Sequence, residues 1–406
     1  MKKTPFSPPR IDQKTIDAVT EVLRSGWITT GPKTKQFEQM LAAYCNVEKV
    51  LCLNSATAGL ELMLRWYGVG PGDEVIVPAY TYCASANVIV HCGATPVFVD
   101  VLEDFTLDPE AVRKALTVHT KVIIPVDIAG WPCDYDALLA LLSEPLVCEM
   151  FTPAHPNQEK LGRPMLLADA AHSLGGVYKN RMVGALADAT VFSFHAVKNL
   201  TTAEGGAIAF SLPDSFDPQE VYNYLNIFSL HGQNKDARAK MEGNSWRYDV
   251  IEAGYKCNMT DIQAAMGCVE LERYDETLAR REKIFKGYAA ALSQQDWAVL
   301  PPFRTADRVS SFHVFALRLK GFREEERDRL LQEMLARGVS VNVHFIPVPM
   351  LAYYKQLGYT IDDYPVAHDL FSHEISLPVY YDLSDQDAER VTDTLISCVQ
   401  HILTNA

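Results

Sequence analysis

Short apolar runs rich in β-branched residues recur along the first 210 residues of the chain. Seven of them are predicted strands: 49–53, 74–77, 96–99, 121–125, 165–169, 189–194 and 206–210. They are almost continuously hydrophobic, which is typical of strands buried on both faces of a sheet. Helical stretches, including 57–67 and 83–91, separate several of these strands. The pattern predicts an α/β fold with a mostly parallel sheet.

The pattern changes in the last third of the chain. Its predicted elements are a long helical stretch from Thr260, a strand over 311–319, a charged helix over 323–337 closed by Gly338, a strand over 339–345, and a last helix capped by Ser384 and Asp387. This mixture of helices and strands is typical of an α+β unit.

Two domains follow from this change in pattern. We expect a large α/β domain over residues 1–260 and a smaller α+β domain over residues 261–406. The 406 residues agree with two or three domains at about 150 residues each. Residues 145–164 are richer in proline and polar residues, and we expect them to form a surface insertion.

Composition and charge narrow the function classes. Hydrophobic residues make up 48% of the chain and the formal net charge is −14, which disfavours general nucleic-acid binding and docking on anionic membranes. The nine cysteines form no C-x-x-C pair, and their odd number predicts no disulfide framework. No apolar run approaches the ~18 residues that a spanning helix needs, and the N-terminus lacks the apolar core of a signal peptide. We therefore expect a cytoplasmic protein.

Three motifs lie where predicted strands end. The segment that begins Asn54-Ser55-Ala56-Thr57 opens a helix, where hydroxyls and backbone N–H groups can bind a phosphate or simply cap the helix. Asp169, three residues before His172, ends a buried strand, where it can face a ligand or cap the next element. Lys198 follows another buried strand, where partial desolvation lowers an amine's pKa and suits it to Schiff-base chemistry, although most lysines are surface residues.

Together the three motifs describe a site for pyridoxal phosphate. In such a site a lysine forms the Schiff base, an aspartate pairs with the pyridinium nitrogen, and a helix N-terminus takes the phosphate. The order of the three groups along one predicted sheet makes this reading stronger than any motif alone.

The chain also resembles the DegT/DnrJ/EryC1/StrS family of PLP-dependent sugar aminotransferases, which have fold type I. The motifs that carry the resemblance span nearly the whole chain: SGWITTGP (25–32), NSATAGLEL (54–62), GPGDEVIVPAYTYCASAN (70–87), GATPVFVD (93–100), ADAAHSLGG (168–176), FSFHAVKNLTTAEGG (192–206), GYKCNMTDIQAAMG (254–267) and VNVHFIPVP (341–349).

The resemblance implies a role for each matching residue. Lys198 would be the Schiff-base lysine and proton carrier, Asp169 would hold the pyridinium, and His172 would contact the cofactor's phenolic oxygen. Tyr82 would stack on the ring. The phosphate contacts would be Ala56, Thr57 and Ser193. The resemblance assigns a sugar pocket to Trp27, Thr29, Thr30, His344 and Phe345.

The resemblance further implies a homodimer with shared active sites. A residue of the G-Y-x-x-x stretch would reach the phosphate of the neighbouring subunit. Many members read G-Y-N-Y-R there, whereas this chain has Gly254-Tyr255-Lys256-Cys257-Asn258, so Lys256 and Asn258 are alternative contacts. The G-Y-K-x-N form is closer to members that aminate UDP-linked 4-keto sugars.

The resemblance implies a reaction that moves an amino group from a donor, glutamate, to a keto carbon of a nucleotide-linked sugar, for cell-surface polysaccharide or related amino-sugar biosynthesis. The expected acceptor is a UDP- or dTDP-linked 4-keto-6-deoxy sugar, and the sequence leaves amination at C3 or C4 open. Lys33, Lys35 and Arg247 are candidate contacts for the nucleotide diphosphate. The alternatives within the family are a sugar dehydratase, which carries histidine in place of Lys198, and a non-catalytic regulator.

The sequence lacks the signature motifs of other enzyme classes. Ala171-His172-Ser173-Leu174-Gly175 misses the first glycine of a G-x-S-x-G nucleophile elbow. Gly68-Val69-Gly70-Pro71-Gly72 lacks the spacing of a dinucleotide-binding loop. His368 and His373 are five residues apart, and no H-E-x-x-H metal motif occurs in the sequence, so we expect no metal site.

Overall fold

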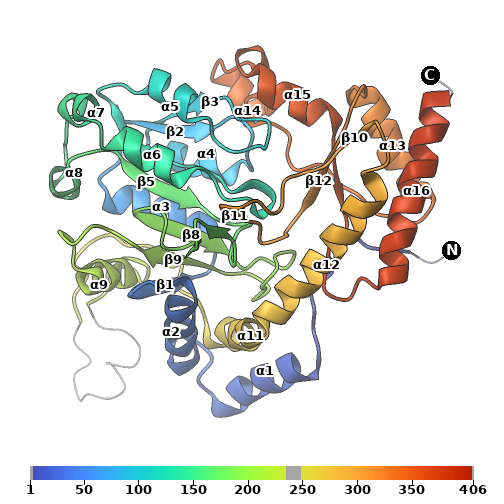
Figure 1. Ribbon diagram of the computed structural model, residues 1–406. Coiled ribbons are helices and arrows are strands. Elements are labelled where there is room, and N and C mark those ends of the chain that lie inside the picture. The colour runs from blue at the N-terminus through green and yellow to red at the C-terminus, as the bar shows by residue number, and fades with distance from the viewer. Residues whose placement is uncertain (1–2, 235–247, 405–406) are drawn as a thin grey trace.

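A seven-stranded sheet forms the core of the N-terminal part of the protein, as the computed structural model shows for residues 3–234 and 248–404 (Figure 1). Its strands are β1 (Lys49–Leu53), β2 (Glu74–Pro78), β3 (Thr95–Val99), β4 (Thr120–Ile123), β5 (Met165–Asp169), β8 (Ala189–Ser193) and β9 (Gly206–Phe210). They lie in the order β1-β9-β8-β5-β4-β2-β3, and only β9 runs antiparallel to its neighbours. The predicted α/β fold with a mostly parallel sheet is confirmed.

Helices cover both faces of this sheet. The N-terminal helices are α1 (Gln13–Ser25), α2 (Pro32–Cys45), α3 (Ala56–Trp66), α4 (Ala84–His91), α5 (Pro109–Ala115), α6 (Tyr135–Leu142) and α9 (Pro218–Phe228). Side chains alternate along β1, so Leu51 and Leu53 join one core with α3, α4 and α9. Val50 and Cys52 point the other way, into a core with α2, α5 and α6. Burial on both faces explains the continuous apolar runs.

The predicted surface insertion contains two short helices, α7 (Pro145–Met150) and α8 (Pro156–Leu161). Each has a proline in its first turn, where the missing N–H would have no helical partner anyway. α8 is attached to the end of α3, because Asn157 Nδ2 donates to Trp66 O (2.7 Å) and Gln158 Nε2 donates to Tyr67 O (2.9 Å).

The C-terminal part has its own core. Its elements are α11 (Asp261–Glu272), α12 (Tyr274–Leu292), β10 (Ala298–Val299), β12 (Phe315–Leu319), α13 (Glu324–Ala336), α14 (Ala352–Gln356), α15 (Pro365–His373), β13 (Glu374–Leu377) and α16 (Asp385–Thr404). The strands form a sheet in the order β10-β12-β13, and a third hydrophobic cluster of residues 284–402 packs around it. A further small sheet joins β11 (Arg308–Val309), β6 (Val177–Tyr178) and β7 (Arg181–Met182). The domain division at residue 260 stays a prediction.

Three expectations for this part need correction. The long helical stretch is two helices, because Arg273 leaves helical geometry at φ −116°. The strand expected over 311–319 begins only at Phe315, since Phe312 has a positive φ of 58°. The strand expected over 339–345 is wrong.

The segment 339–345 changes partners along its length. Val339 pairs with Thr4 and Asn342 pairs with Ser376, each as an isolated bridge, so no continuous ladder can form. The cap of the last helix is confirmed, since Ser384 Oγ accepts a hydrogen bond from the Asp387 backbone N–H (3.1 Å).

Candidate active site

A cavity of about 490 Å³ opens at the carboxyl ends of the parallel strands. This edge of an open α/β sheet is where ligands usually bind. The predicted site residues that line it are Ala56, Thr57, Tyr82, Asp169, His172, Ser193, Lys198, His344 and Phe345. Segments far apart in sequence therefore meet around one space, as the three strand-end motifs predicted.

Lys198 lies in the loop between β8 and β9. Phe194 N–H donates to Gly205 O (2.8 Å) and Thr202 N–H donates to Phe194 O (2.9 Å), which closes the base of the loop. Asn199 Nδ2 anchors the loop on Ser311 O (2.7 Å). Burial lowers the pKa of Lys198 to about 8, although the nearby Asp169 carboxylate acts in the opposite direction. An amine with this pKa is available in its neutral, nucleophilic form near neutral pH.

Asp169 ends β5 and is buried. Its Oδ2 accepts a hydrogen bond from Ser85 Oγ (2.7 Å), and its Oδ1 accepts one from the Ala171 backbone N–H (3.2 Å). Burial raises the pKa of this carboxyl, whereas the two hydrogen bonds and the positive charge of Lys198 lower it. A fixed carboxylate of this kind can pair with a cationic ring nitrogen.

His172 is held in one orientation. Its Nδ1 accepts a hydrogen bond from the Ala129 backbone N–H (3.2 Å), so in the neutral ring the proton lies on Nε2. Burial, Lys198 and His344 keep the pKa of His172 well below its ordinary value. The ring stacks on Phe345 at 5.7 Å, and that of His313 lies 4.5 Å away. His172 therefore presents a neutral N–H donor.

The N-terminus of α3 forms one wall of the cavity. Ser55 caps the helix by accepting a hydrogen bond from Ala58 N–H (3.1 Å), and Ala56 and Thr57 occupy the first turn. The first backbone N–H groups of a helix lack intrahelical partners and attract anions. Gly206 lies so close that a Cβ there would come 2.4 Å from the Ala56 nitrogen, so glycine is required beside this turn.

Tyr82 lies at the rim of the cavity and is 58% exposed. Its ring is 5.5 Å from that of Phe345, at an interplanar angle of 50°. The two aromatic rings form one side of the cavity opening, where a flat ligand can stack.

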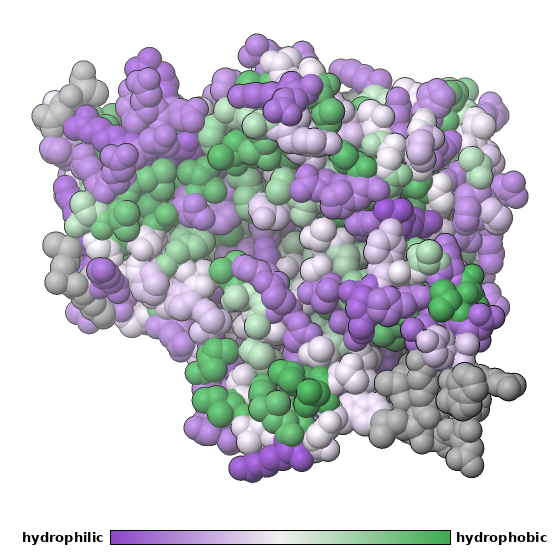
Figure 2. Space-filling view, turned by 180° about the vertical axis from the view of Figure 1, so that it is seen from behind, coloured by the Kyte–Doolittle hydropathy of each residue, from purple (hydrophilic) through white to green (hydrophobic). Residues whose placement is uncertain are grey.

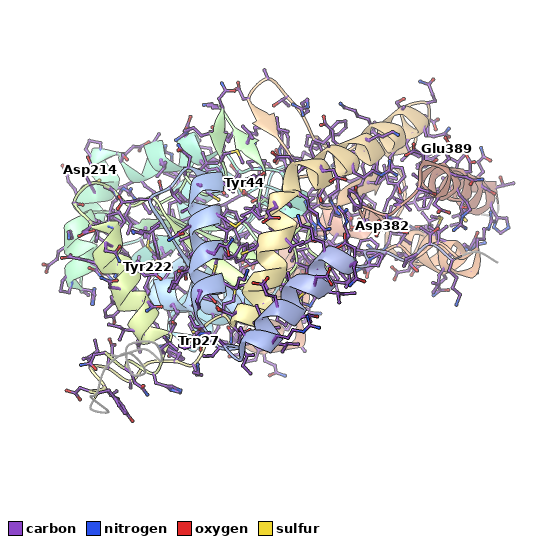
Figure 3. All side chains as sticks on the ribbon, turned by 90° about the horizontal axis from the view of Figure 1, so that it is seen from below. Trp27, Tyr44, Asp214, Tyr222, Asp382 and Glu389 are labelled. Atoms are coloured by element: carbon purple, nitrogen blue, oxygen red, sulfur yellow. The ribbon has the colours of Figure 1, made fainter. Side chains whose placement is uncertain are left out.

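The structure places the other predicted site residues elsewhere. Lys256, Asn258, Trp27, Thr29 and Thr30 are absent from the lining of the cavity and gather in a second group, which we call the 27–30/256–258 surface. Asn258 Nδ2 donates to Thr30 Oγ (2.6 Å), and Trp27 Nε1 donates to Thr30 O (3.1 Å). Figure 3 shows Trp27 between α1 and α2.

The 27–30/256–258 surface is fixed to the edge strand of the sheet. Asn258 pairs with Leu53 at the end of β1, and Lys256 Nζ contacts Asn258 Oδ1. Asp261 holds the adjoining loop by accepting hydrogen bonds from the backbone N–H groups of Gly31 (2.8 Å) and Thr34 (2.9 Å).

The candidate nucleotide contacts are engaged in other interactions. Lys33 pairs with Glu21 at 3.7 Å, and Lys35 pairs with Glu38 at 3.1 Å. Arg247 lies outside the described residues. In the described part of the chain, no group of three or more metal-binding side chains occurs.

Sequence reasoning missed Ser85 and His313. Ser85 is three residues after Tyr82 and positions Asp169, yet a small residue in an apolar helix gives no signal by itself. His313 lies in an apolar run that was predicted to be strand, where a histidine could have been noticed. Its Nδ1 is 2.8 Å from Asn199 Oδ1, so it supports the loop that carries Lys198.

Comparison with known proteins agrees with this geometry. A family model described as the DegT/DnrJ/EryC1/StrS aminotransferase family matches residues 9–148 and 160–396. The chain belongs to this family. The unmatched gap falls within the insertion that carries α7 and α8.

Individual relatives extend over the full length. The spore coat polysaccharide biosynthesis protein SpsC of Bacillus subtilis is 38% identical over 404 residues, which cover 98% of this chain and 97% of SpsC. The putative sugar aminotransferase Spr1654 of Streptococcus pneumoniae, in its PMP form, has a TM-score of 0.95 at 46% identity and covers 98% and 100% of the two chains.

A more distant structure has the same fold. PseC of Helicobacter pylori, an aminotransferase involved in the biosynthesis of pseudoaminic acid, has a TM-score of 0.86 at 27% identity, over 98% and 100% of the two chains. The expected fold type I, the enzyme class of aminotransferase and the cofactor pyridoxal phosphate are thereby confirmed.

Proposed function

We propose that this aminotransferase passes an amino group from glutamate to a keto carbon of a nucleotide-linked sugar, with Lys198 as the residue that binds the cofactor covalently. The observation that carries the proposal is the convergence of Lys198, Asp169 and the N-terminus of α3 on one cavity. An amine, a carboxylate and an anion site there match the three ends of pyridoxal phosphate.

The described residues fit this cofactor. When bound, it supplies an electron sink that stabilises negative charge on the carbon that loses its proton. Asp169 would hold the positive ring nitrogen, and the Nε2–H of His172 would be available to the phenolic oxygen. The first turn of α3, with Thr57 and Ser193, would hold the phosphate. The Lys198 amine would carry the proton that leaves the carbon of the amino donor.

The proposed acceptor is a UDP- or dTDP-linked 4-keto-6-deoxy sugar used for cell-surface polysaccharide. The name of SpsC refers to a coat polysaccharide, which supports this class of product. Phe345 and His344 add an aromatic and a polar wall to the cavity, a combination suited to a sugar.

We also propose a homodimer, in which the 27–30/256–258 surface of one subunit completes the cavity of the other. Lys256 is exposed and lies at the sheet edge, outside the lining of its own cavity. Exposed apolar side chains on and beside α1 (Ile11, Ile16, Leu23 and Ile28) provide area for such an interface. Figure 2 shows apolar side chains gathered at the lower end of the molecule, the end at which Figure 1 places α1.

We place the reaction in the cytoplasm. All nine cysteines are free thiols, which supports a reducing compartment. Among the described helices, none is long and apolar enough to cross a membrane.

Substrate choice is tested by supplying the purified enzyme with glutamate and a panel of UDP- and dTDP-linked 3-keto and 4-keto sugars. The proposal predicts 2-oxoglutarate formation that depends on a 4-keto nucleotide sugar, together with an aminated sugar detected by mass spectrometry. Turnover with a non-sugar ketone, together with no turnover with any member of the panel, would refute the sugar assignment.

A further inference from the structure

A chain of three side chains leads from a buried carboxyl group to the cavity. Ser376 Oγ lies 2.5 Å from Glu374 Oε1, and His344 Nδ1 lies 2.8 Å from Ser376 Oγ. Glu374 and Ser376 are two residues apart on β13, so their side chains share one face of the strand. Both are fully buried, whereas His344 lines the cavity. These three hydrogen-bonded side chains therefore connect the protein interior with the cavity.

The His344 ring is held from several sides. Its backbone N–H donates to Glu374 Oε2 (3.0 Å), and its carbonyl accepts from Tyr80 OH (2.8 Å). Phe6 stacks on the ring at 5.4 Å and 26°. Nδ1 is used by Ser376, so Nε2 is the nitrogen left for a ligand. Within the described part of the chain, the one polar contact of Nε2 is a long one, 3.5 Å to the exposed Asn342 Nδ2.

The hydrogen bonds of Ser376 link the protonation state of Glu374 to the tautomer of the His344 ring. Ser376 has a single hydroxyl proton. While Glu374 is ionised, that proton points to Oε1, so Ser376 must accept from His344 Nδ1–H and Nε2 carries a lone pair. When Glu374 Oε1 is protonated it donates to Ser376, whose own proton then points to Nδ1, and Nε2 carries the hydrogen. One proton on Glu374 therefore decides what Nε2 offers to the cavity.

The charges around Glu374 allow both states near neutral pH. Burial raises the pKa of Glu374 to about 8, while Ser376, the His344 N–H and the guanidinium of Arg327 on α13 act in the opposite direction. Arg327 donates to the backbone carbonyls of Phe371 (2.7 Å) and Glu374 (3.3 Å). On β12, Arg318 is the cross-strand partner of Glu374, and its guanidinium contacts Glu103.

The groups that face His344 keep its ring neutral. Burial and the positive charge of Lys198 lower the pKa of His344 to about 4. The charge of His344 would lower the pKa of two neighbouring histidines, His172 and His313, and the pKa of each is well below its ordinary value. A neutral ring can change only its tautomer, so the switch is between Nδ1–H and Nε2–H.

We propose that Glu374, Ser376 and His344 form a proton relay into the cavity, with Glu374 and Ser376 as positioning residues that set the tautomer of His344. The purpose assigned to the relay rests on the proposed function. A keto oxygen that is replaced by an amine leaves as water, which requires protons. His344 Nε2 gives one proton to that oxygen, Nδ1 takes the Ser376 proton, Ser376 takes the Glu374 proton, and a carboxylate remains.

The reverse transfer restores the relay in the other half of the reaction. The amino donor enters as an ammonium ion and must lose a proton before its nitrogen can act as a nucleophile. Nε2 takes that proton, Nδ1 returns its own to Ser376, and Ser376 returns one to Glu374. Each complete cycle then leaves the three side chains unchanged.

Nuclear magnetic resonance of the holoenzyme with ¹⁵N-labelled histidine tests the tautomer directly, with His344→Gln identifying the His344 signals. We expect the wild type to change from Nε2–H to Nδ1–H between pH 6 and pH 10. In Glu374→Gln the backbone N–H of His344 orients the amide oxygen, so the amide nitrogen donates to Ser376 and the ring remains Nε2–H throughout. The same tautomer in wild type and variant at every pH would overturn the relay.

Two further variants separate the relay from a general effect of mutation. Ser376→Ala interrupts the chain without removing Glu374, and its His344 tautomer is expected to lose its pH dependence. Glu38→Gln is the matched control, because Glu38 is also buried and also accepts a backbone N–H (Cys52, 3.0 Å) and a hydroxyl (Tyr222, 2.8 Å). Its His344 signals should follow those of the wild type.

The kinetic expectation is a fall in kcat of at least about tenfold in Glu374→Gln and Ser376→Ala, since general acid–base groups typically contribute about 10²–10⁴-fold. Wild-type kcat in both variants would contradict the relay. A tautomer switch in an enzyme that aminates no nucleotide sugar would refute the proposed function and leave the relay standing, so the two failures are distinguishable.

Discussion

The cavity and the 27–30/256–258 surface both carry residues that the sequence assigned to one active site, yet they differ in how complete they are. In the cavity, Lys198, Asp169 and His172 meet within a single chain, and their environments already shift their pKa values. In the second group, Asn258 and Thr30 bind one another at the sheet edge. This difference is expected if the proposed homodimer forms, in which the catalytic groups of each site come from one subunit and part of the binding surface comes from the other.

Removing the cavity lysine should have the largest effect. We expect Lys198→Ala to lose transamination by at least about 10³-fold, because it removes both the covalent attachment and the proton carrier. Turnover is followed by 2-oxoglutarate formation. Lys179→Ala, at an exposed lysine paired with Asp136, is the control and should retain wild-type turnover. Full activity in Lys198→Ala would remove the basis of the mechanism.

Neutralising the buried carboxylate should come next. Asp169→Asn is expected to reduce kcat by about 10²–10³-fold, since it removes a fixed charge at the site where charge develops. Asp188→Asn serves as the control, because Asp188 is also buried but lies just before β8, at the opposite edge of the sheet, where it pairs with Arg163 at 2.8 Å. The account fails here if both variants lose stability and activity in parallel.

A smaller effect is expected at the second surface. Loss of a charge-assisted hydrogen bond of about 1.5–3 kcal/mol predicts that Lys256→Ala weakens cofactor affinity by roughly 10–100-fold. A mixed dimer combines one Lys198→Ala subunit with one Lys256→Ala subunit. One of its two cavities then has both an intact Lys198 and an intact Lys256 from the partner, so activity should return to about half or less of the wild-type level. No complementation would show that the two groups do not act across subunits.

The pH dependence of cofactor attachment is the mildest test. The pKa of Lys198 is lowered to about 8, and only the neutral amine attacks a carbonyl. The attachment rate in cofactor-stripped enzyme should therefore rise about tenfold per unit below pH 8 and level off above it. A rate that continues to rise to pH 10 is the behaviour of an ordinary lysine with a pKa of about 10.4.

Sequence alone predicted the cavity well because its residues follow strands whose hydrophobic patterns are strong. Asp169 and Ser193 end strands close to their predicted limits, and the direction of parallel strands brings such ends together. Segment 339–345 was wrongly predicted to be a strand because its sequence is rich in apolar residues. Its backbone forms only isolated bridges to Thr4 and Ser376 within the described residues. Local composition does not encode such distant partners.

The relay was beyond sequence reasoning for a related reason. Glu374 and Ser376 alternate with apolar residues in HEISLP, which resembles an ordinary half-exposed strand. Only the fold shows that their shared face is buried against His344. The residues of the 27–30/256–258 surface could be identified from their sequence motifs. Their separation from the cavity could be seen only in the structure.

Chemical mapping of the cofactor linkage tests the central claim most directly. The holoenzyme is reduced with borohydride, digested, and analysed by mass spectrometry for a lysine that carries the reduced cofactor. The account predicts the modification on Lys198, in the loop between β8 and β9, and nowhere else in stoichiometric amount. Modification of a different lysine, or a fully active enzyme without any covalently attached cofactor, would contradict it.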